Sequence, residues 1–137
     1  MRKFLVLAVL VALFVGCESS RERFIKDYSE GCQYGPNAGA PNADIACDCT
    51  AEFLATQFSD KELDYMQKLS DPFYQPQSMQ DMNARVFLKE KMSRLQGALE
   101  SGNDRAFIRA FAKFMAPCAR AKGLPDMTEE KILGVMR

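Results

Sequence analysis

Four of the five cysteines, Cys32, Cys47, Cys49 and Cys118, are the side chains best suited to covalent or metal chemistry in this sequence. Their even number favours two disulfide bonds, which persist in oxidising compartments. A zinc site is not predicted, because the cysteine spacing contains no Cys-x-x-Cys and the chain has no histidine to complete a ligand set. The alternative is a Cu(I)-binding or thiol-redox pair of Cys47 and Cys49 with some of the eight methionines, since soft ligands suit Cu(I).

Cys47 and Cys49 are expected to bond to different partners. They lie in a segment with helical periodicity, and residues two apart on a helix point about 200° apart. This geometry excludes a Cys47–Cys49 bridge and therefore also Cys32–Cys118. Of the two remaining connectivities, we expect Cys32–Cys49 with Cys47–Cys118, because Cys47 and Cys118 each lie on an apolar helical stripe. The pairing Cys32–Cys47 with Cys49–Cys118 stays open.

No catalytic or cofactor-binding residue is predicted. The absence of histidine removes the commonest general base and excludes Ser-His, Cys-His and His-metal mechanisms. The acidic groups at 60–64 and 129–130 fall near the starts of expected helices, where the helix dipole favours carboxylates. No glycine-rich phosphate loop is present. We therefore expect a protein that is not an enzyme and that needs no cofactor.

The N-terminal segment has the layout of a secretory signal peptide. Arg2 and Lys3 precede an unbroken apolar run over 4–15, and Gly16 then precedes Cys17. The run has twelve residues, whereas a membrane-spanning helix needs about 20. We therefore expect residues 1–16 to be removed.

The stretch Phe14-Val15-Gly16-Cys17 resembles the lipobox of bacterial lipoproteins, with Phe14 where leucine is usual. The resemblance covers this segment alone. It implies that the Cys17 thiol is diacylated and that Cys17 becomes the first residue of the mature chain. It also implies a place in the bacterial cell envelope, with membrane attachment through the lipid. Glu18 follows where an aspartate would signal retention in the inner membrane, so an outer-membrane lipoprotein facing the periplasm is expected.

The mature chain would be one small domain. We expect a lipidated tether over 17–21 and a single helical domain over 22–137. Without Arg2 and Lys3, 16 basic and 18 acidic side chains remain, a net charge of about −2. No basic block is available to neutralise phosphates, so nucleic acid is not a predicted partner.

Apolar residues recur at helical spacing along the whole of the expected domain, and no segment alternates in the manner of a strand. The sequence predicts an all-α fold, a small bundle of five to six short helices joined by two disulfides. The first helix starts near Ser20 and ends near Gly35, and a terminal helix starts at Thr128. Four helices are expected between them, over 43–58, from Ser59 to Asp71, over 79–101 and over 104–122. Ser59 with Glu62 forms a capping box, Asn42 can cap the second helix, and Gly102 suits a helix C-cap.

Two aromatic groups have different interpretations. The stripe Phe107, Phe111, Phe114 and Met115 is expected to be core, with a groove for an apolar ligand as the alternative. Phe73 and Tyr74 lie in a proline-flanked loop over 71–78, where exposed aromatics would mark an interface. The alternative is that they fold back as a lid over the bundle.

These observations together predict a small periplasm-facing lipoprotein that acts as a non-enzymatic protein-binding module with a protein partner in the cell envelope. A pilotin-like assembly factor and an immunity or inhibitor protein are similar in size and design. The alternative is a periplasmic Cu(I) or thiol-redox protein that uses Cys47, Cys49 and methionines.

Overall fold

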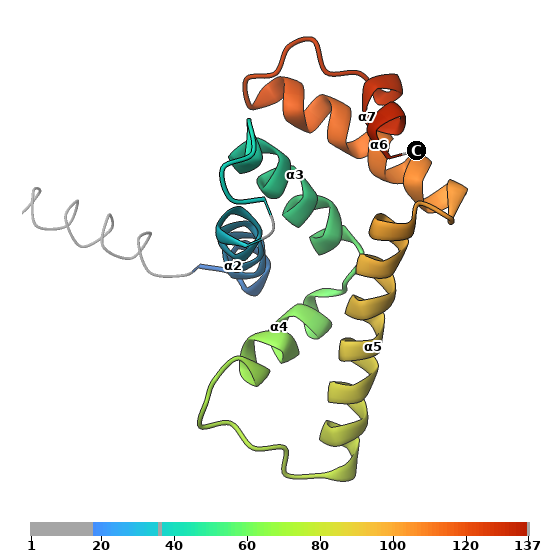
Figure 1. The fold of residues 1–137 in the computed structure, drawn as a ribbon. Helices are drawn as coiled ribbons and strands as arrows, with labels where there is room; N and C mark the ends of the chain where they lie inside the picture. The colour runs from blue at the N-terminus through green and yellow to red at the C-terminus, as the bar shows by residue number, and fades with distance from the viewer. Residues whose placement is uncertain (1–17, 36, 137) are drawn as a thin grey trace, which may run out of the picture.

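The computed structural model describes residues 18–35 and 37–136, so the predicted signal peptide and Cys17 lie outside the described residues. The described chain forms six helices and contains no strand. The prediction of an all-α bundle with two disulfides is confirmed. The helices are α2 (Ser20–Tyr34), α3 (Ala43–Thr56), α4 (Asp60–Leu69), α5 (Met79–Ser101), α6 (Arg105–Ala121) and α7 (Glu129–Val135) (Figure 1).

Most helix ends follow local sequence signals. Ser59 and Glu62 form the predicted capping box at the start of α4. Gly102 closes α5 in the left-handed conformation, with φ of 64°, which glycine adopts at little cost. The prediction for Asn42 is wrong in its mechanism. Asn42 precedes α3 but has φ of 57°, and its side chain makes no capping hydrogen bond, because a side-chain cap requires extended backbone.

The core lies where α3 crosses α6. Phe53 of α3 is at its centre, with the rings of Phe107, Phe111 and Phe114 at centroid distances of 5.1 to 5.6 Å. Met115 is buried beside them. The interpretation of the Phe107–Met115 stripe as core is thus confirmed. Phe111 and Met115 also line a groove beside the core, so the alternative of a groove for an apolar ligand is not contradicted. The central position of Phe53 was not predicted. A second cluster forms between α4 and α5 around Phe58, Leu63 and Leu88.

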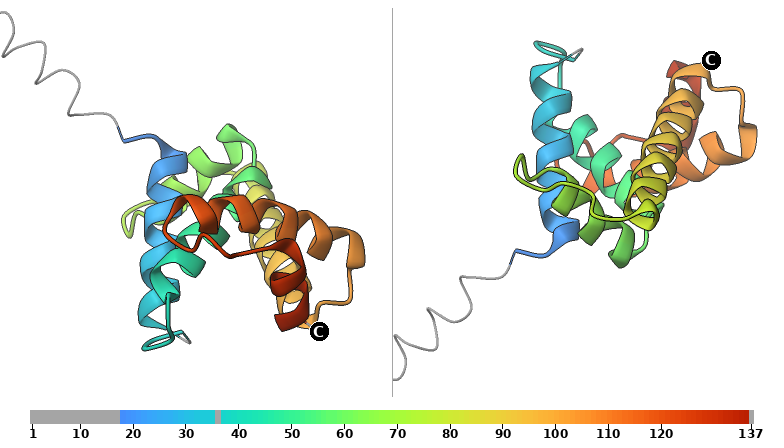
Figure 2. Two further views of the ribbon diagram at one scale, coloured as in Figure 1. Left: turned by 90° about the horizontal axis from the view of Figure 1, so that it is seen from above. Right: turned by 90° about the horizontal axis from the view of Figure 1, so that it is seen from below.

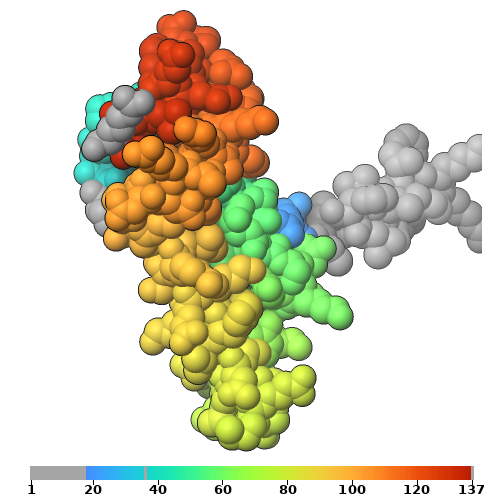
Figure 3. Space-filling view, turned by 90° about the vertical axis from the view of Figure 1, so that its right-hand side faces the viewer, coloured from blue at the N-terminus to red at the C-terminus, as the bar shows by residue number. Residues whose placement is uncertain are grey.

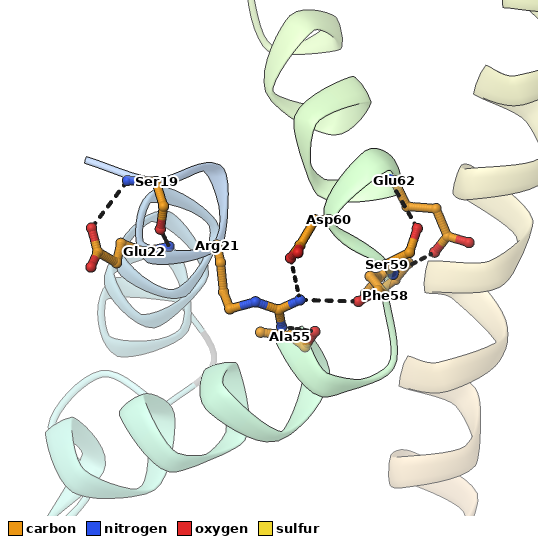
Figure 4. Close-up of polar contacts among 8 residues, drawn as sticks. All are labelled: Ser19, Arg21, Glu22, Ala55, Phe58, Ser59, Asp60 and Glu62. Atoms are coloured by element: carbon orange, nitrogen blue, oxygen red, sulfur yellow. Dashed lines mark hydrogen bonds and ion pairs between the residues drawn. The ribbon is translucent and has the colours of Figure 1, made fainter. Parts of the chain in front are cut away.

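The first helix begins earlier than the predicted tether allows. Ser20 and Arg21 lie inside α2, and Ser19 caps the helix in a capping box with Glu22. The Arg21 guanidinium donates to the backbone oxygens of Ala55 and Phe58 and pairs with Asp60 at 2.8 Å (Figure 4). A tether reaching residue 21 is therefore wrong, because Arg21 is needed to hold the turn between α3 and α4.

The two disulfides join Cys32 to Cys47 and Cys49 to Cys118. The prediction that Cys47 and Cys49 have different partners is confirmed, but the preferred pairing is wrong. The reason is the direction in which α3 presents its two cysteines. Cys49 belongs to the core cluster that includes α6, while Cys47 faces the C-terminal end of α2. Each bridge thus fastens α3 to a different neighbour.

Helix α5 forms one edge of the molecule (Figures 1 and 2). Its N-terminal half packs against α4, and residues nearer its C-terminal end join the core beside α6. The loop over 70–78 joins α4 to α5 at the far end of this pair. Figure 3 shows that the start of α5 and this loop form a narrow end that extends beyond the rest of the molecule. This end carries the surface considered next.

Candidate functional site

The most distinctive surface of the described chain is an apolar strip on the outward side of α5. Four of its residues are 50 to 71% exposed although they are large and apolar. They recur at spacings of three, four and one, which places them on one side of a helix with 3.6 residues per turn. Phe73 is 91% exposed in a different place, in the loop after α4, where its neighbours Asp71 and Pro72 line a hollow together with Glu18 and Ser20 at the start of α2. We call the four α5 residues the outer apolar face; its members are Met79, Met82, Val86 and Phe87.

The opposite side of α5 is also apolar, and that side is covered. Leu88 is 4% exposed and packs with Leu63 of α4. The ammonium of Lys91 lies on this covered side, 2.8 Å from the Glu62 carboxylate and 4.7 Å from the centre of the Phe58 ring. Helix α5 therefore carries apolar residues on two sides, of which one is buried.

The two loop aromatics lie in different surroundings. Tyr74 is half-buried, and its ring meets the Tyr65 ring edge-on at 6.3 Å. The Tyr65 hydroxyl donates to the backbone oxygen of Asp81 at 2.7 Å, which ties α4 to the start of α5. Burial, followed by the neighbouring Tyr74 hydroxyl, raises the pKa of Tyr65 to about 12. Tyr74 thus fixes the loop while Phe73 is left in solvent; neither folds over the bundle as a lid.

The charges around the outer apolar face are mainly basic. Arg85, Lys89 and Arg94 are exposed on α5, and none forms an ion pair with the described residues. Glu90 is the one carboxylate exposed among them along the same stretch. The face therefore combines an apolar centre with a basic border, which favours an acidic partner surface.

A polar cluster beside the disulfides is the other arrangement that could do chemistry. The buried Ser29 hydroxyl donates to the Asp48 carboxylate, and Lys122 lies 2.9 Å from Glu52 and 3.9 Å from Asp48. The hydrogen bond to Glu52 is the main cause that raises the pKa of Lys122. Lys122 is therefore protonated at neutral pH and cannot act as a general base for Ser29. The cluster instead ties α2, α3 and the end of α6 together.

The described residues contain no group of three potential metal-ligating His, Cys, Asp or Glu side chains. Cys47 and Cys49, on which the copper or redox alternative depends, are each bonded to another cysteine. Over 18–35 and 37–136, none of the helices combines the length and apolar character that crossing a membrane requires. Comparison with protein-family models, with curated proteins and with solved structures finds no match to this chain.

Proposed function

We propose that this protein is a lipid-anchored, non-enzymatic module of the bacterial cell envelope that binds an acidic, apolar surface of a partner protein. The observation that carries the proposal is the uncovered outer apolar face on α5. Contiguous exposed apolar residues are rare on monomeric soluble proteins and mark interaction sites. The compartment and the anchor rest on the lipobox resemblance at Cys17.

The composition of the face supports a protein partner. Phenylalanine and methionine are enriched in the buried centres of protein interfaces, and charged residues lie at their borders. The face has this arrangement, with Phe87 and Val86 beside two methionines and with Arg85, Lys89 and Arg94 nearby. Two copies of the chain would bring these basic groups together, so charge disfavours self-association through this face.

The experiment compares captured partners for two matched variants. The double variant Val86→Ser, Phe87→Ser removes the centre of the face, and the double variant Tyr34→Ser, Val135→Ser removes two exposed apolar residues elsewhere. Each protein is cross-linked in the intact cell envelope, and its adducts are identified by mass. We expect an adduct with one protein bearing an acidic, apolar segment, lost in the first variant and kept in the second.

Binding of the purified partner then provides the quantitative test. The affinity should fall at least tenfold in the face variant, since interface aromatics often contribute more than ~1.4 kcal/mol each. It should also weaken as salt concentration rises. Equal loss in both variants, or an adduct that consists of two copies of this chain, would overturn the proposal.

A further inference from the structure

We infer that the groove between α3, α6 and α7 binds a single-chain amphiphile with an anionic head, of which a fatty acid is the simplest example. This inference is independent of the proposed function, because the groove shares no residue with the outer apolar face. The groove has a volume of about 760 Å³, and sites for small molecules typically have ~300–1,000 Å³.

The groove is built from apolar side chains of all three helices. Buried Phe111 and Met115 of α6 line it, and Ile45 and Ala46 of α3 contribute a second wall. Ile132 of α7 also lines the groove and packs against the same core. The Cys32–Cys47 disulfide also lines the groove, so a covalent bond holds α2 and α3 together beside it.

A single charge borders this apolar surface. Among the lining residues, all within the described chain, Lys131 of α7 is the one ionisable side chain, and none is a carboxylate. The Lys131 ammonium donates to the neutral backbone oxygen of Asp126 at 2.8 Å, and it forms no ion pair with the residues that the structure describes. A long apolar surface with one cation at its border is complementary to an apolar tail with one anionic group.

The polar groups of the groove favour an acyl chain over a peptide. A bound peptide must satisfy the amide and carbonyl groups of its own backbone, at a cost of roughly 1–3 kcal/mol for each one left unpaired. Of the three polar uncharged side chains in the lining, the Thr50 hydroxyl already donates to the Ala46 backbone oxygen at 2.8 Å. An acyl chain needs no such partners, so it suits a groove that offers few.

The test uses the full-length chain with Cys17→Ser, so that the acyl chains of the anchor do not compete. Laurate is titrated below its micelle concentration in a calorimeter, and dodecyltrimethylammonium, with the same tail and opposite charge, is titrated in parallel. We expect saturable binding of one laurate and roughly fivefold weaker binding of the cation, the upper end of the range for an exposed ion pair. Absence of saturable laurate binding, or equal binding of both amphiphiles, would overturn the inference.

Four variants locate the site. Ala46→Trp, at an exposed position of α3, should fill the groove and weaken laurate binding at least tenfold. If Ala46→Trp lowers the melting temperature, Val135→Trp replaces it, because its indole would fill the groove from α7 and should weaken laurate binding equally. Lys131→Glu should weaken binding roughly fivefold, as for a partly exposed ion pair. Lys61→Glu, on α4, makes the same charge change away from the groove and should have no effect. Unchanged binding in the groove variants would place the amphiphile elsewhere and refute the assignment.

Discussion

Phe73 and Tyr74 are neighbours in sequence with opposite environments, which gives the loop over 70–78 two separable properties. Phe73→Ala should leave the melting temperature nearly unchanged, because the ring is 91% exposed. Tyr74→Ala should destabilise the fold by about 0.5–1.5 kcal/mol, the range for an aromatic pair such as Tyr74 with Tyr65. Urea unfolding of both variants measures the difference. A large loss of stability in Phe73→Ala would place its ring in the core and contradict its exposure to solvent.

Tyr65 gives the molecule a specific response to alkaline pH. Burial and the adjacent Tyr74 raise the pKa of Tyr65 to about 12, from an ordinary value of 10.0. The unfolded chain releases this proton first as pH rises, so the contribution of Tyr65 to stability is complete below pH 10 and is lost between pH 10 and about 12. Burial also raises the pKa of Tyr28. Ultraviolet titration should therefore show late ionisation of both tyrosines, and Tyr65→Phe should reduce the absorbance change between pH 10 and about 12. An unchanged titration in that variant would contradict the assignment.

At the scale of the element, α5 is tested by two consecutive residues, of which one is exposed and the other buried. Leu88→Ala should cost about 2–5 kcal/mol, because Leu88 is buried against α4. Phe87→Ala removes a larger side chain but should cost far less, because Phe87 is 52% exposed. Chemical denaturation of the two variants compares them directly. Equal costs would mean that α5 is rotated relative to the arrangement described.

The two disulfides should differ in their contribution to stability. Cys49 and Cys118 are 69 residues apart and Cys32 and Cys47 are 15 apart, and a longer closed loop restrains the unfolded chain more. Replacing Cys49 and Cys118 by alanine should lower the free energy of unfolding by about 4 kcal/mol, and replacing Cys32 and Cys47 should lower it by about 3 kcal/mol. Urea unfolding measures both, and peptide mapping without reduction checks the pairing. A Cys32–Cys49 peptide would contradict the connectivity.

The elements themselves could be predicted because their signals are local. The capping box of Ser59 and Glu62 satisfies backbone groups at the start of α4, and Gly102 satisfies one at the end of α5. In both cases the interacting residues lie within about one helical turn of each other, so the interaction can be predicted from neighbouring positions in the sequence. The disulfide pairing could not be predicted in the same way. Helical spacing indicates that Cys47 and Cys49 point apart, but which neighbour each one meets depends on how α2 and α6 pack against α3.

The second apolar side of α5 was missed for a related reason. The periodic seam through Leu88 predicts the covered side of the helix, and residues off that seam were left without a role. Val86 and Phe87 gain meaning from their exposure, which depends on the tertiary arrangement. The irregular loop offered a clearer signal, because aromatics between prolines stand out in composition. Phe73 could thus be selected from the sequence as an exposed aromatic, whereas the outer apolar face on α5 could not.

At the scale of the whole molecule, the proposed membrane attachment would depend on Cys17. Cys17→Ser should abolish acylation and either release the domain into the soluble periplasmic fraction or leave the signal peptide uncut. Membrane fractionation with intact-mass measurement distinguishes these results from the wild type. Membrane association together with a mass that differs only by the substituted residue would contradict the lipobox assignment.

The early start of α2 determines how far an anchored molecule could reach. Only Glu18 and Ser19 separate Cys17 from Ser20, and Ser19 is already held in the capping box. Three residue steps span at most ~11 Å, so a lipid on Cys17 would keep the domain against the membrane surface. The outer apolar face lies on the side of the molecule away from the start of α2 (Figures 1 and 2). In such a molecule the outer apolar face would point away from the membrane, at a distance from the membrane surface equal to the width of the domain. A partner would therefore have to bind close to the membrane.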